Sequence, residues 1–242
     1  VAITPDSAIQ IQKLGHDCIL ESGAGIASGF NDSDYKAAGV KIVKSSIVLW
    51  EEAEIIVKVR DPEPIEYKEF RKGQTVISFF NPLENSVGLE EAVASGTNVI
   101  AMELVPRISR AQKMDALSSM ANISGYRAVI EAGNNFGRFF TGQITAAGKV
   151  PPAKVLVIGA GVAGLAAIGT ATSLGAIVRA FDVRPEVAEQ IESMGAEFLL
   201  LDFDDNQDGA STGGYAAPSS PEFRKKQLEL FLGQAPDIDI VI

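Results

Sequence analysis

Cysteine and histidine are almost absent from this sequence of 242 residues, which contains one of each, Cys18 and His16. One cysteine cannot build a disulfide framework, and one cysteine with one histidine cannot supply a Cys/His zinc cluster. The scarcity of thiols fits a reducing or matrix-type compartment. We interpret His16, which lies just before an expected strand, as an ordinary surface residue and Cys18 as a small core residue.

Long apolar runs and basic residues are also scarce. The most apolar long stretch, residues 162–181, is rich in glycine, alanine and threonine, so it does not predict a membrane span. The formal net charge is −10, which disfavours binding of nucleic acid or anionic membranes through bulk charge. No signal peptide is visible, and the sequence starts at Val1 without methionine, so it makes no prediction about targeting.

The sequence does contain a regular alternation of short apolar runs and longer amphipathic segments. Hydrophobic residues make up 46% and charged residues 21%, as in ordinary globular proteins. Strands alternating with helices at this rhythm predict a parallel sheet with helices on both faces. In the first part of the chain we expect strands at 1–3, 18–20, 40–43, 55–59, 75–79 and 98–102, and helices at 7–14, 34–38, 47–53, 66–72 and 85–95.

The pattern changes after residue 108. Apolar residues at helical spacing predict one long helix over residues 109–132, crossing from one domain to the next. A second α/β series follows the break at Lys149-Val-Pro-Pro152. Its expected strands are 154–158, 177–181, 197–201 and 238–242, its expected helices are 162–174, 185–194 and 223–232, and residues 202–221 are expected to form a long loop.

These elements predict an α/β fold with two doubly wound parallel-sheet (Rossmann-like) domains. The expected domains are an N-terminal Rossmann-like domain over residues 1–125 and a second Rossmann domain over residues 126–242. A doubly wound dinucleotide domain has about six strands, and four are expected in the second domain. We therefore expect that domain to be truncated at its C-terminal end.

The strongest local motif is the run from Val155 to Gly164, an apolar strand followed by G-x-G-x-x-G and a helix. Gly159 permits a tight turn, Gly161 lets a pyrophosphate approach the backbone, and Gly164 lets the helix pack closely on the strand. The helix N-terminus favours the negative charge of the phosphates. The residues expected to contact the cofactor here are Gly159, Ala160, Gly161, Val162 and Gly164.

A second expected strand ends at Asp182, 18 residues after the last glycine of the motif. A carboxylate at this position is typical of one that accepts hydrogen bonds from the adenosine ribose, and it disfavours a 2′-phosphate. NAD(H) is therefore expected rather than NADP(H). Val183 and Arg184 follow directly, and Arg184 is the one residue here that would suit a 2′-phosphate.

A polar run leads the expected long helix and contains Arg107, Gln112, Asp115 and Ser118. On pattern alone it has two interpretations. It could be a solvated helix start capped by Ser109, or it could be a set of hydrogen-bonding groups at a domain junction beside a cleft.

The run Pro106-Arg-Ile-Ser-Arg-Ala-Gln-Lys-Met-Asp115, followed by Leu117-Ser-Ser119 and Gly125-Tyr-Arg-Ala-Val129, resembles the NAD(H)-binding alpha subunit (domain I) of proton-translocating NAD(P)+ transhydrogenases. The resemblance continues through Thr145–Pro152, the glycine motif and Asp182–Arg184. It extends to residues 213–216 and 222–227. At the front, Val1–Pro5 and Val57–Pro62 are similar to the start that this family shares with alanine dehydrogenases.

The resemblance implies roles for the polar run. Arg107 and Ser118 would hold the nicotinamide carboxamide, Gln112 would lie near the nicotinamide ribose, and Asp115 would order Arg107 or the amide. Hydride transfer between two nicotinamides needs close approach and fixed orientation rather than an acid or a base. Tyr215, on a loop rich in glycine, would fold over the bound nucleotide, although a polar connection without that role is the alternative.

The same resemblance implies that NAD(H) binds in a cleft between the domains and that NADP(H) is held on a partner domain. A proton-translocating membrane domain would be a further partner, and the chain would be a homodimer on the soluble face of the membrane, either the bacterial cytoplasmic side or the mitochondrial matrix side. We expect a transhydrogenase of the Re/Si-specific, proton-translocating type. No nucleic acid is expected as a partner, because the chain is acidic. No metal site is expected either, because the acidic residues Asp202, Asp204, Asp205 and Asp208 lack EF-hand spacing.

Two alternatives stay open. The first is a soluble amino-acid dehydrogenase of the alanine dehydrogenase type, in which a lysine matching Lys58 and a later histidine act on the substrate. Here the later strand reads Thr75-Val-Ile-Ser-Phe-Phe-Asn81 and has no histidine, so the acid–base group is missing. The second is a non-catalytic NAD-binding module, which would bind NAD(H) without transferring hydride.

Overall fold

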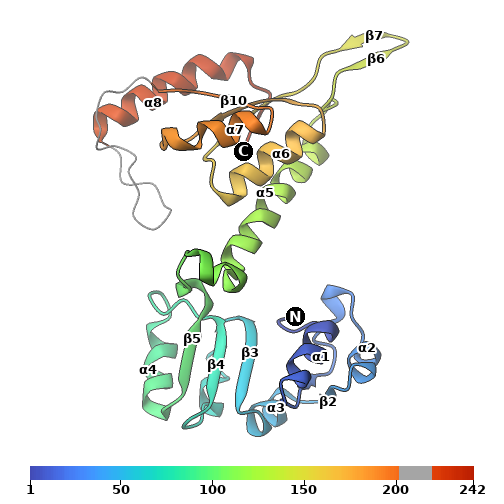
Figure 1. The fold of residues 1–242 in the computed structure, drawn as a ribbon, viewed down its shortest axis with the longest axis vertical. Coiled ribbons are helices and arrows are strands. Elements are labelled where there is room, and N and C mark those ends of the chain that lie inside the picture. The colour runs from blue at the N-terminus through green and yellow to red at the C-terminus, as the bar shows by residue number, and fades with distance from the viewer. Residues whose placement is uncertain (202–219) are drawn as a thin grey trace. The chain divides into compact units, whose positions relative to one another are not determined.

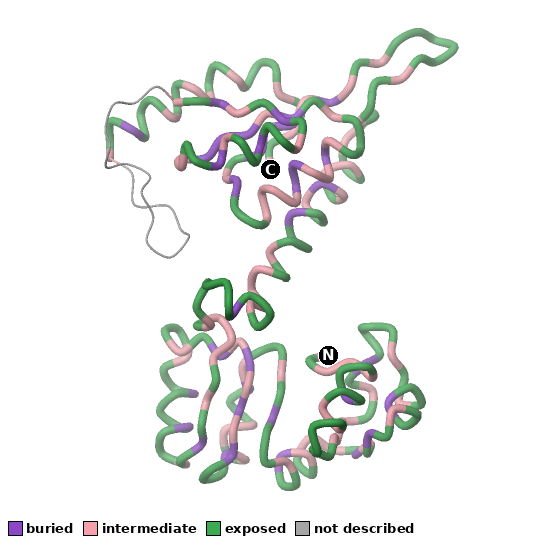
Figure 2. The backbone as a smooth tube through the Cα atoms, viewed as in Figure 1, coloured by how far each residue is buried: buried purple, intermediate pink, exposed green. Residues whose placement is uncertain are grey.

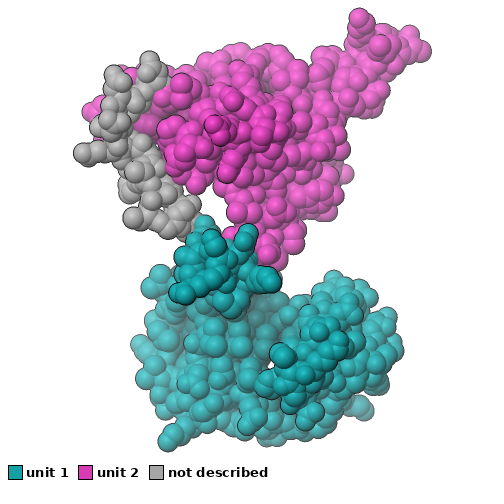
Figure 3. Space-filling view, in the orientation of Figure 1, with its two compact units in different colours: residues 1–115 teal, residues 116–242 magenta. Residues whose placement is uncertain are grey.

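The chain divides into two compact units, Val1–Asp115 and Ala116–Ile242 (Figure 3). This computed structural model describes residues 1–201 and 220–242. Both units combine helices with parallel sheets, which confirms the α/β fold class. The domain limits expected from the sequence, 1–125 and 126–242, stay a prediction.

Unit 1 contains two parallel sheets (Figure 1). The strands β1 (Ile19–Glu21) and β2 (Lys41–Val43) form one pair, and β3 (Ile55–Arg60), β4 (Thr75–Phe79) and β5 (Asn98–Ala101) form a sheet in that order. The helices of the unit are α1 (Pro5–Lys13), α2 (Asp32–Ala37), α3 (Ser46–Glu52) and α4 (Ser86–Ser95). The short 3₁₀ turns are η1 (Ile26–Ser28), η2 (Tyr67–Glu69), η3 (Met102–Leu104) and η4 (Ser109–Met114).

One face of the β3–β4–β5 sheet carries the main core of unit 1. Ile56, Val76 and Phe80 are buried there against Trp50 of α3 and Ala92 of α4. Trp50 is 2% exposed and its Nε1–H donates to Glu66 at 3.1 Å, so it is a packing residue. The alternate residues of β3, Ile55, Val57 and Val59, point to the other face and remain 38–50% exposed.

Unit 2 is built on a four-stranded parallel sheet, the strand number that the sequence predicted. Its order is β10 (Glu197–Phe198), β9 (Ile177–Phe181), β8 (Lys154–Ile158) and β11 (Ile240–Val241). The helices are α5 (Ala116–Asn135), α6 (Val162–Ser173), α7 (Ala188–Ser193) and α8 (Pro221–Gln234), with 3₁₀ turns η5 (Pro185–Val187) and η6 (Ala235–Asp237). An antiparallel hairpin, β6 (Gln143–Thr145) and β7 (Gly148–Val150), extends away from the rest of the unit (Figure 1).

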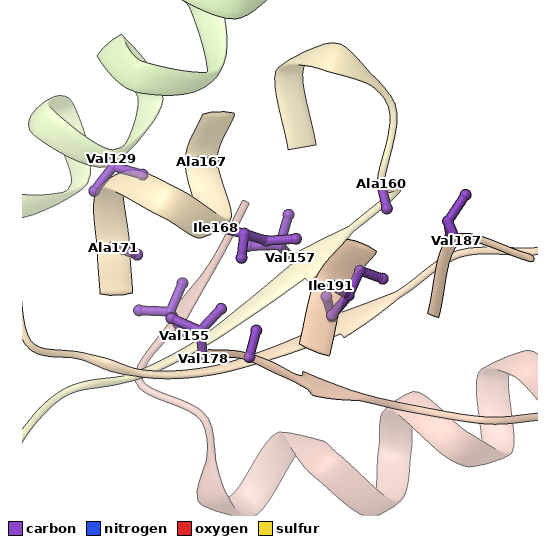
Figure 4. Packing of buried hydrophobic residues seen from close by; sticks show 12 residues of the cluster. Val129, Val155, Val157, Ala160, Ala167, Ile168, Ala171, Val178, Val187 and Ile191 are labelled. Carbon is purple, nitrogen blue, oxygen red and sulfur yellow. The ribbon is translucent and has the colours of Figure 1, made fainter. Parts of the chain in front are cut away.

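The core of unit 2 lies where the central strands meet α5, α6 and α7 (Figure 2). Side chains from these elements converge in Figure 4: Val155 and Val157 from β8, Ile168 from α6, Val129 from α5 and Ile191 from α7. All five are at most 1% exposed. Fully buried aliphatic side chains of this kind each stabilise the fold by about 1.5–3 kcal/mol, so this cluster holds the glycine turn and its helix against the sheet.

Helices α5 and α6 approach each other at backbone distance. A Cβ built on Gly125 of α5 would lie 1.9 Å from the carbonyl oxygen of Ala163 on α6. Since no real Cβ contact is that short, glycine is the residue that this packing requires. The seam also uses alanines: Ala167 and Ala171 of α6 are fully buried.

Three expected elements need correction, and one further element was not expected. Residues 1–3 form no strand, and residues 66–72 form only the short turn η2, because Phe70 turns to an extended conformation to bury its ring in the core. The long helix expected over residues 109–132 is broken at Asp115, whose ψ of 75° separates η4 from α5. The sequence reading also missed the β6–β7 hairpin, whose exposed residues give no apolar strand signal.

No helix in the described ranges, 1–201 and 220–242, is long and apolar enough to cross a membrane.

We expect Gly125→Ala to destabilise unit 2 by about 1–3 kcal/mol, because α5 or α6 must shift to admit the new Cβ. Gly233→Ala is the matched control: Gly233 also lies within a helix, α8, and a Cβ there would meet nothing within 4 Å. The control should be neutral or stabilising by up to about 1 kcal/mol. Urea denaturation of both variants checks this, and an equal effect of the two would show that the α5–α6 contact has room for a side chain.

Candidate functional site

The glycine loop, residues 159–164, follows the buried strand β8 and turns into α6. Val155, Leu156 and Val157 are buried in the middle of the sheet, which fixes the point where the loop begins. Gly159 has a φ of +101°, a backbone conformation that favours glycine, and its N–H donates to the Phe181 carbonyl at 2.7 Å. The turn therefore leaves the sheet beside the end of β9.

Gly164 is required by close packing inside the loop. A Cβ on Gly164 would lie 1.7 Å from the carbonyl oxygen of Gly159. The first turn of α6 thus rests directly on the backbone of the turn before it, as the sequence motif predicts.

Gly161 differs from the other two glycines, because nothing in the described chain requires glycine there. Its φ is −75°, and a Cβ at this position would meet no protein atom within 4 Å. Gly161 is also the N-cap residue of α6, and no described side chain makes a capping hydrogen bond to this helix start. The result is an open surface in front of backbone N–H groups at the positive end of a helix, an arrangement suited to a phosphate.

Asp182 lies at the end of β9 and is tied to this loop. Its Oδ2 accepts the Ala160 N–H at 2.6 Å, so the carboxylate fixes the conformation of the glycine loop. Oδ1 accepts the backbone N–H of Arg184 at 2.9 Å. The Arg184 guanidinium closes a bidentate pair, with Nε 2.9 Å from Oδ1 and Nη2 3.0 Å from Oδ2.

The Asp182–Arg184 pair is largely withdrawn from water, since the two side chains are 6% and 17% exposed. Burial raises the pKa of Asp182, but the hydrogen bonds from Arg184 and from the Ala160 N–H outweigh it and hold the pKa below its usual value. The same hydrogen bond with Asp182 raises the pKa of Arg184. Both groups are therefore charged at neutral pH, and each neutralises the other.

The remaining expected cofactor contacts near the glycine loop differ in exposure. Ala160 is 2% exposed and Val162 is 40% exposed. Val183 packs against the core cluster of Phe181 and Phe223, so its side chain serves the fold. The structure thus joins Ala160, Asp182 and Arg184 by direct hydrogen bonds, and Gly159 is bonded to the neighbouring Phe181.

The polar run does not lie within a single unit, because the boundary between the units falls after Asp115. Arg107 and Gln112 are exposed and Asp115 is half-buried, and all three belong to unit 1. Ser118 is half-buried in the first turn of α5, in unit 2. The N-cap position of η4 is Ile108, which corrects the alternative in which Ser109 caps this helix start.

Tyr215 and the acidic residues at 202, 204, 205 and 208 lie outside the described residues. Within the described part of the chain, no cluster of three or more histidine, cysteine or carboxylate side chains could hold a metal ion. Ser220 and Pro221, expected to end the long loop, instead cap and begin α8.

Lys58 has a partner that sequence reasoning missed. Its ammonium donates to the Glu66 carboxylate, which also accepts the Trp50 Nε1–H and the Glu63 N–H. Burial raises the pKa of Glu66, but these hydrogen bonds, that from Lys58 first, keep it below its usual value. The only available sequence signal was the opposite charge of the two residues, eight positions apart.

Comparison with known proteins gives two family matches that together span most of the chain. The family described as "Alanine dehydrogenase/PNT, N-terminal domain" matches residues 1–124, and "Alanine dehydrogenase/PNT, C-terminal domain" matches residues 128–242. The chain is 71% identical over its whole length to NAD(P) transhydrogenase subunit alpha of Cereibacter sphaeroides, of which it spans 46%. The chain thus spans about half the length of that curated relative.

Two solved structures are similar across both units. The transhydrogenase of Sinorhizobium meliloti matches with a TM-score of 0.87 and 40% identity, over 100% of this chain and 64% of that one. An L-alanine dehydrogenase matches with a TM-score of 0.71 and 29% identity, over 82% of this chain and 56% of that one.

We expect Asp182→Asn to cost about 1–3 kcal/mol of folding stability at pH 7, because it weakens charge-assisted hydrogen bonds in a buried pair. The pKa of Asp182 is lower in the folded chain, so its contribution is present above the unfolded pKa, near 4, and is lost as the pH falls through the folded value. The stability difference between wild type and variant should therefore shrink in acid.

Urea denaturation at neutral pH and near pH 3 measures that difference. Glu189→Gln, at an exposed carboxylate on α7, is the control and should change stability by less than about 0.5 kcal/mol at either pH. A stability difference for Asp182→Asn that does not change with pH would contradict the charged pair.

Proposed function

The chain belongs to the alanine dehydrogenase/PNT family, and we propose that it is the NAD(H)-binding part of a proton-translocating NAD(P)+ transhydrogenase. In this proposal it binds NAD(H) on unit 2 and orients it for direct hydride transfer to NADP+ held on a partner domain. The whole-chain identity of 71% to a transhydrogenase alpha subunit supports this choice within the family.

The observation that carries the proposal is the open position at Gly161. Gly159 and Gly164 are explained by the backbone around them, whereas Gly161 is not. A glycine that the fold does not need, at the uncapped start of α6, fits a pyrophosphate that must approach the backbone closely.

The residues present fit a dinucleotide. The N–H groups at the start of α6 would hold the pyrophosphate, and Asp182 at the end of β9 would face the adenosine ribose. When bound, NAD(H) supplies the nicotinamide ring that carries the hydride. The negative charge of Asp182 supports a preference for NAD(H) over NADP(H), because it disfavours a 2′-phosphate.

Arg107, Gln112, Asp115 and Ser118 are proposed to hold the nicotinamide end. They offer hydrogen-bonding groups that orient an amide and a ribose, and orientation is what hydride transfer between two rings requires. Proton transfer does not enter the step, which agrees with a chain that has a single, exposed histidine.

The partners belong to the proposal as well. They are an NADP(H)-binding domain, a proton-translocating membrane domain and a second copy of the chain. The relatives are named as alpha subunits, which supports further subunits in the assembly. We place the chain on the soluble face of the membrane, where both nucleotides are accessible.

The alanine dehydrogenase activity is not favoured by the structure of unit 1. Lys58, which would act on an amino-acid substrate, is ion-paired with Glu66. The residue after β4 and Phe80 is Asn81 rather than histidine, and it has a positive φ of 50°. A lysine that is already paired with a carboxylate, with no histidine after β4, is poorly equipped for imine chemistry.

We expect Gly161→Ala to fold with a loss of at most about 1 kcal/mol, since alanine is only a poorer N-cap residue there. Its affinity for NADH should fall by about tenfold or more, because the new methyl group occupies the space proposed for the pyrophosphate. Calorimetric titration with NADH and a thermal melt separate the two effects. Unchanged NADH affinity in a folded variant would remove the pyrophosphate from this position.

The proposed function is tested by mixing the full chain with an NADP(H)-binding transhydrogenase domain and following hydride transfer from NADH to an NADP+ analogue of distinct absorbance. Fast transfer that needs both proteins is expected. Arg107→Ala or Gln112→Ala should slow the transfer by about 10²-fold while NADH affinity changes much less. Each variant loses a group that orients the nicotinamide end but keeps the contacts to the adenosine half.

Lys113→Ala, at an exposed residue of η4, is the matched control and should leave the transfer rate near wild type. Absence of transfer with intact NADH binding would reject the proposal, and activity with pyruvate and ammonia alone would replace it with an amino-acid dehydrogenase. A non-catalytic module would bind NADH and transfer hydride to no acceptor.

A further inference from the structure

Arg184 and two backbone N–H groups together occupy the hydrogen-bonding capacity of the Asp182 carboxylate. The two carboxylate oxygens of Asp182 together accept four hydrogen bonds, two from backbone N–H groups and two from the Arg184 guanidinium. An ionised carboxylate has about four acceptor positions, so this one is saturated. A ribose hydroxyl can donate to Asp182 only if Arg184 yields one of its two bonds.

Arg184 lies three residues beyond the end of β9, near the position where a dinucleotide-binding fold that prefers NADP(H) has an arginine for the 2′-phosphate. The planar guanidinium suits phosphate as well as it suits carboxylate, because both accept two parallel hydrogen bonds. This chain therefore carries both the acidic residue of an NAD(H) site and the basic residue of an NADP(H) site, and they are bonded to one another.

We propose that Arg184 is a latent 2′-phosphate ligand that Asp182 holds out of use. Asp182 then determines the preference for NAD(H) in two ways, by its own negative charge and by engaging the one nearby cation that would bind the phosphate. The proposal rests on the proposed function, because it concerns the adenosine end of the same NAD(H) site.

The burial of the pair explains why a 2′-phosphate does not simply take Arg184 from Asp182. The side chains are 6% and 17% exposed, and removing the guanidinium would leave a buried carboxylate without its counter-charge. That carboxylate would also face the incoming phosphate. Asp182→Asn removes both the need for a counter-charge and the repulsion of the phosphate, and the test is based on this variant.

The test compares four forms of the full chain: wild type, Asp182→Asn, Arg184→Gln and the double variant. Calorimetric titration measures two probes, 5′-AMP and adenosine 2′,5′-bisphosphate, which differ by the 2′-phosphate alone. Each titration is made at low and at high ionic strength, since a charge-based contact weakens as salt is added. Thermal melts check that every form is folded.

Wild type should bind 5′-AMP and discriminate against the bisphosphate. Asp182→Asn should bind the bisphosphate at least about tenfold more tightly than wild type does, with a strong salt dependence, and the double variant should lose most of that gain. Arg184→Gln alone should bind the bisphosphate no better than wild type, because it leaves the carboxylate charged.

Equal gains in Asp182→Asn and the double variant would overturn the proposal, since the loss of one negative charge would then explain the whole effect. Absence of any gain in Asp182→Asn would overturn it too. If Asp182→Asn does not fold, Asp182→Ser, which retains an acceptor for the Ala160 N–H, is compared with and without Arg184→Gln under the same criteria. Failure of wild type to bind 5′-AMP or NADH would instead reject the proposed function.

Discussion

The close backbone contacts of α6 are the constraint on which unit 2 depends. Gly164 lies against the carbonyl of Gly159, and Gly125 of α5 lies against the carbonyl of Ala163, each at a distance that excludes a side chain. The first turn of α6 is thereby held between its own glycine turn and a second helix. Ser118 lies in the first turn of α5. The helix that carries Ser118 is therefore packed on α6, whose N-terminus we propose as the phosphate site.

Asp182 adds a second constraint to the same turn. Its carboxylate receives the N–H of Ala160 inside the glycine loop and the guanidinium of Arg184 outside it. The charge at the end of β9 and the conformation of the glycine loop therefore depend on one another. A substitution meant to change selectivity at Asp182 will also disturb the loop, and this is why variants that keep an acceptor for Ala160 are the informative ones.

The sequence predicted the features that local chemistry dictates. The G-x-G-x-x-G motif predicted the tight turn at Gly159 and the close packing of Gly164, and the alternation of strands and helices predicted four parallel strands in unit 2. It did not predict the break at Asp115, because the helical periodicity of apolar residues is similar on both sides of that residue. Nor could it predict that Arg184 bonds Asp182 in bidentate fashion, since spacing of two residues does not specify side-chain rotamers.

In both units, a cationic side chain that could take part in catalysis is already ion-paired with a carboxylate. Lys58 is bonded to Glu66 in unit 1, and Arg184 is bonded to Asp182 in unit 2. A cation held in this way already donates hydrogen bonds to a carboxylate, so it is poorly placed to act on a substrate. An enzyme that protonates an imine needs an available acid–base group, whereas hydride transfer between two nicotinamide rings needs only that the rings be held. The pairing of these charges therefore favours a site that binds and orients its nucleotide over one that performs acid–base chemistry on an amino acid.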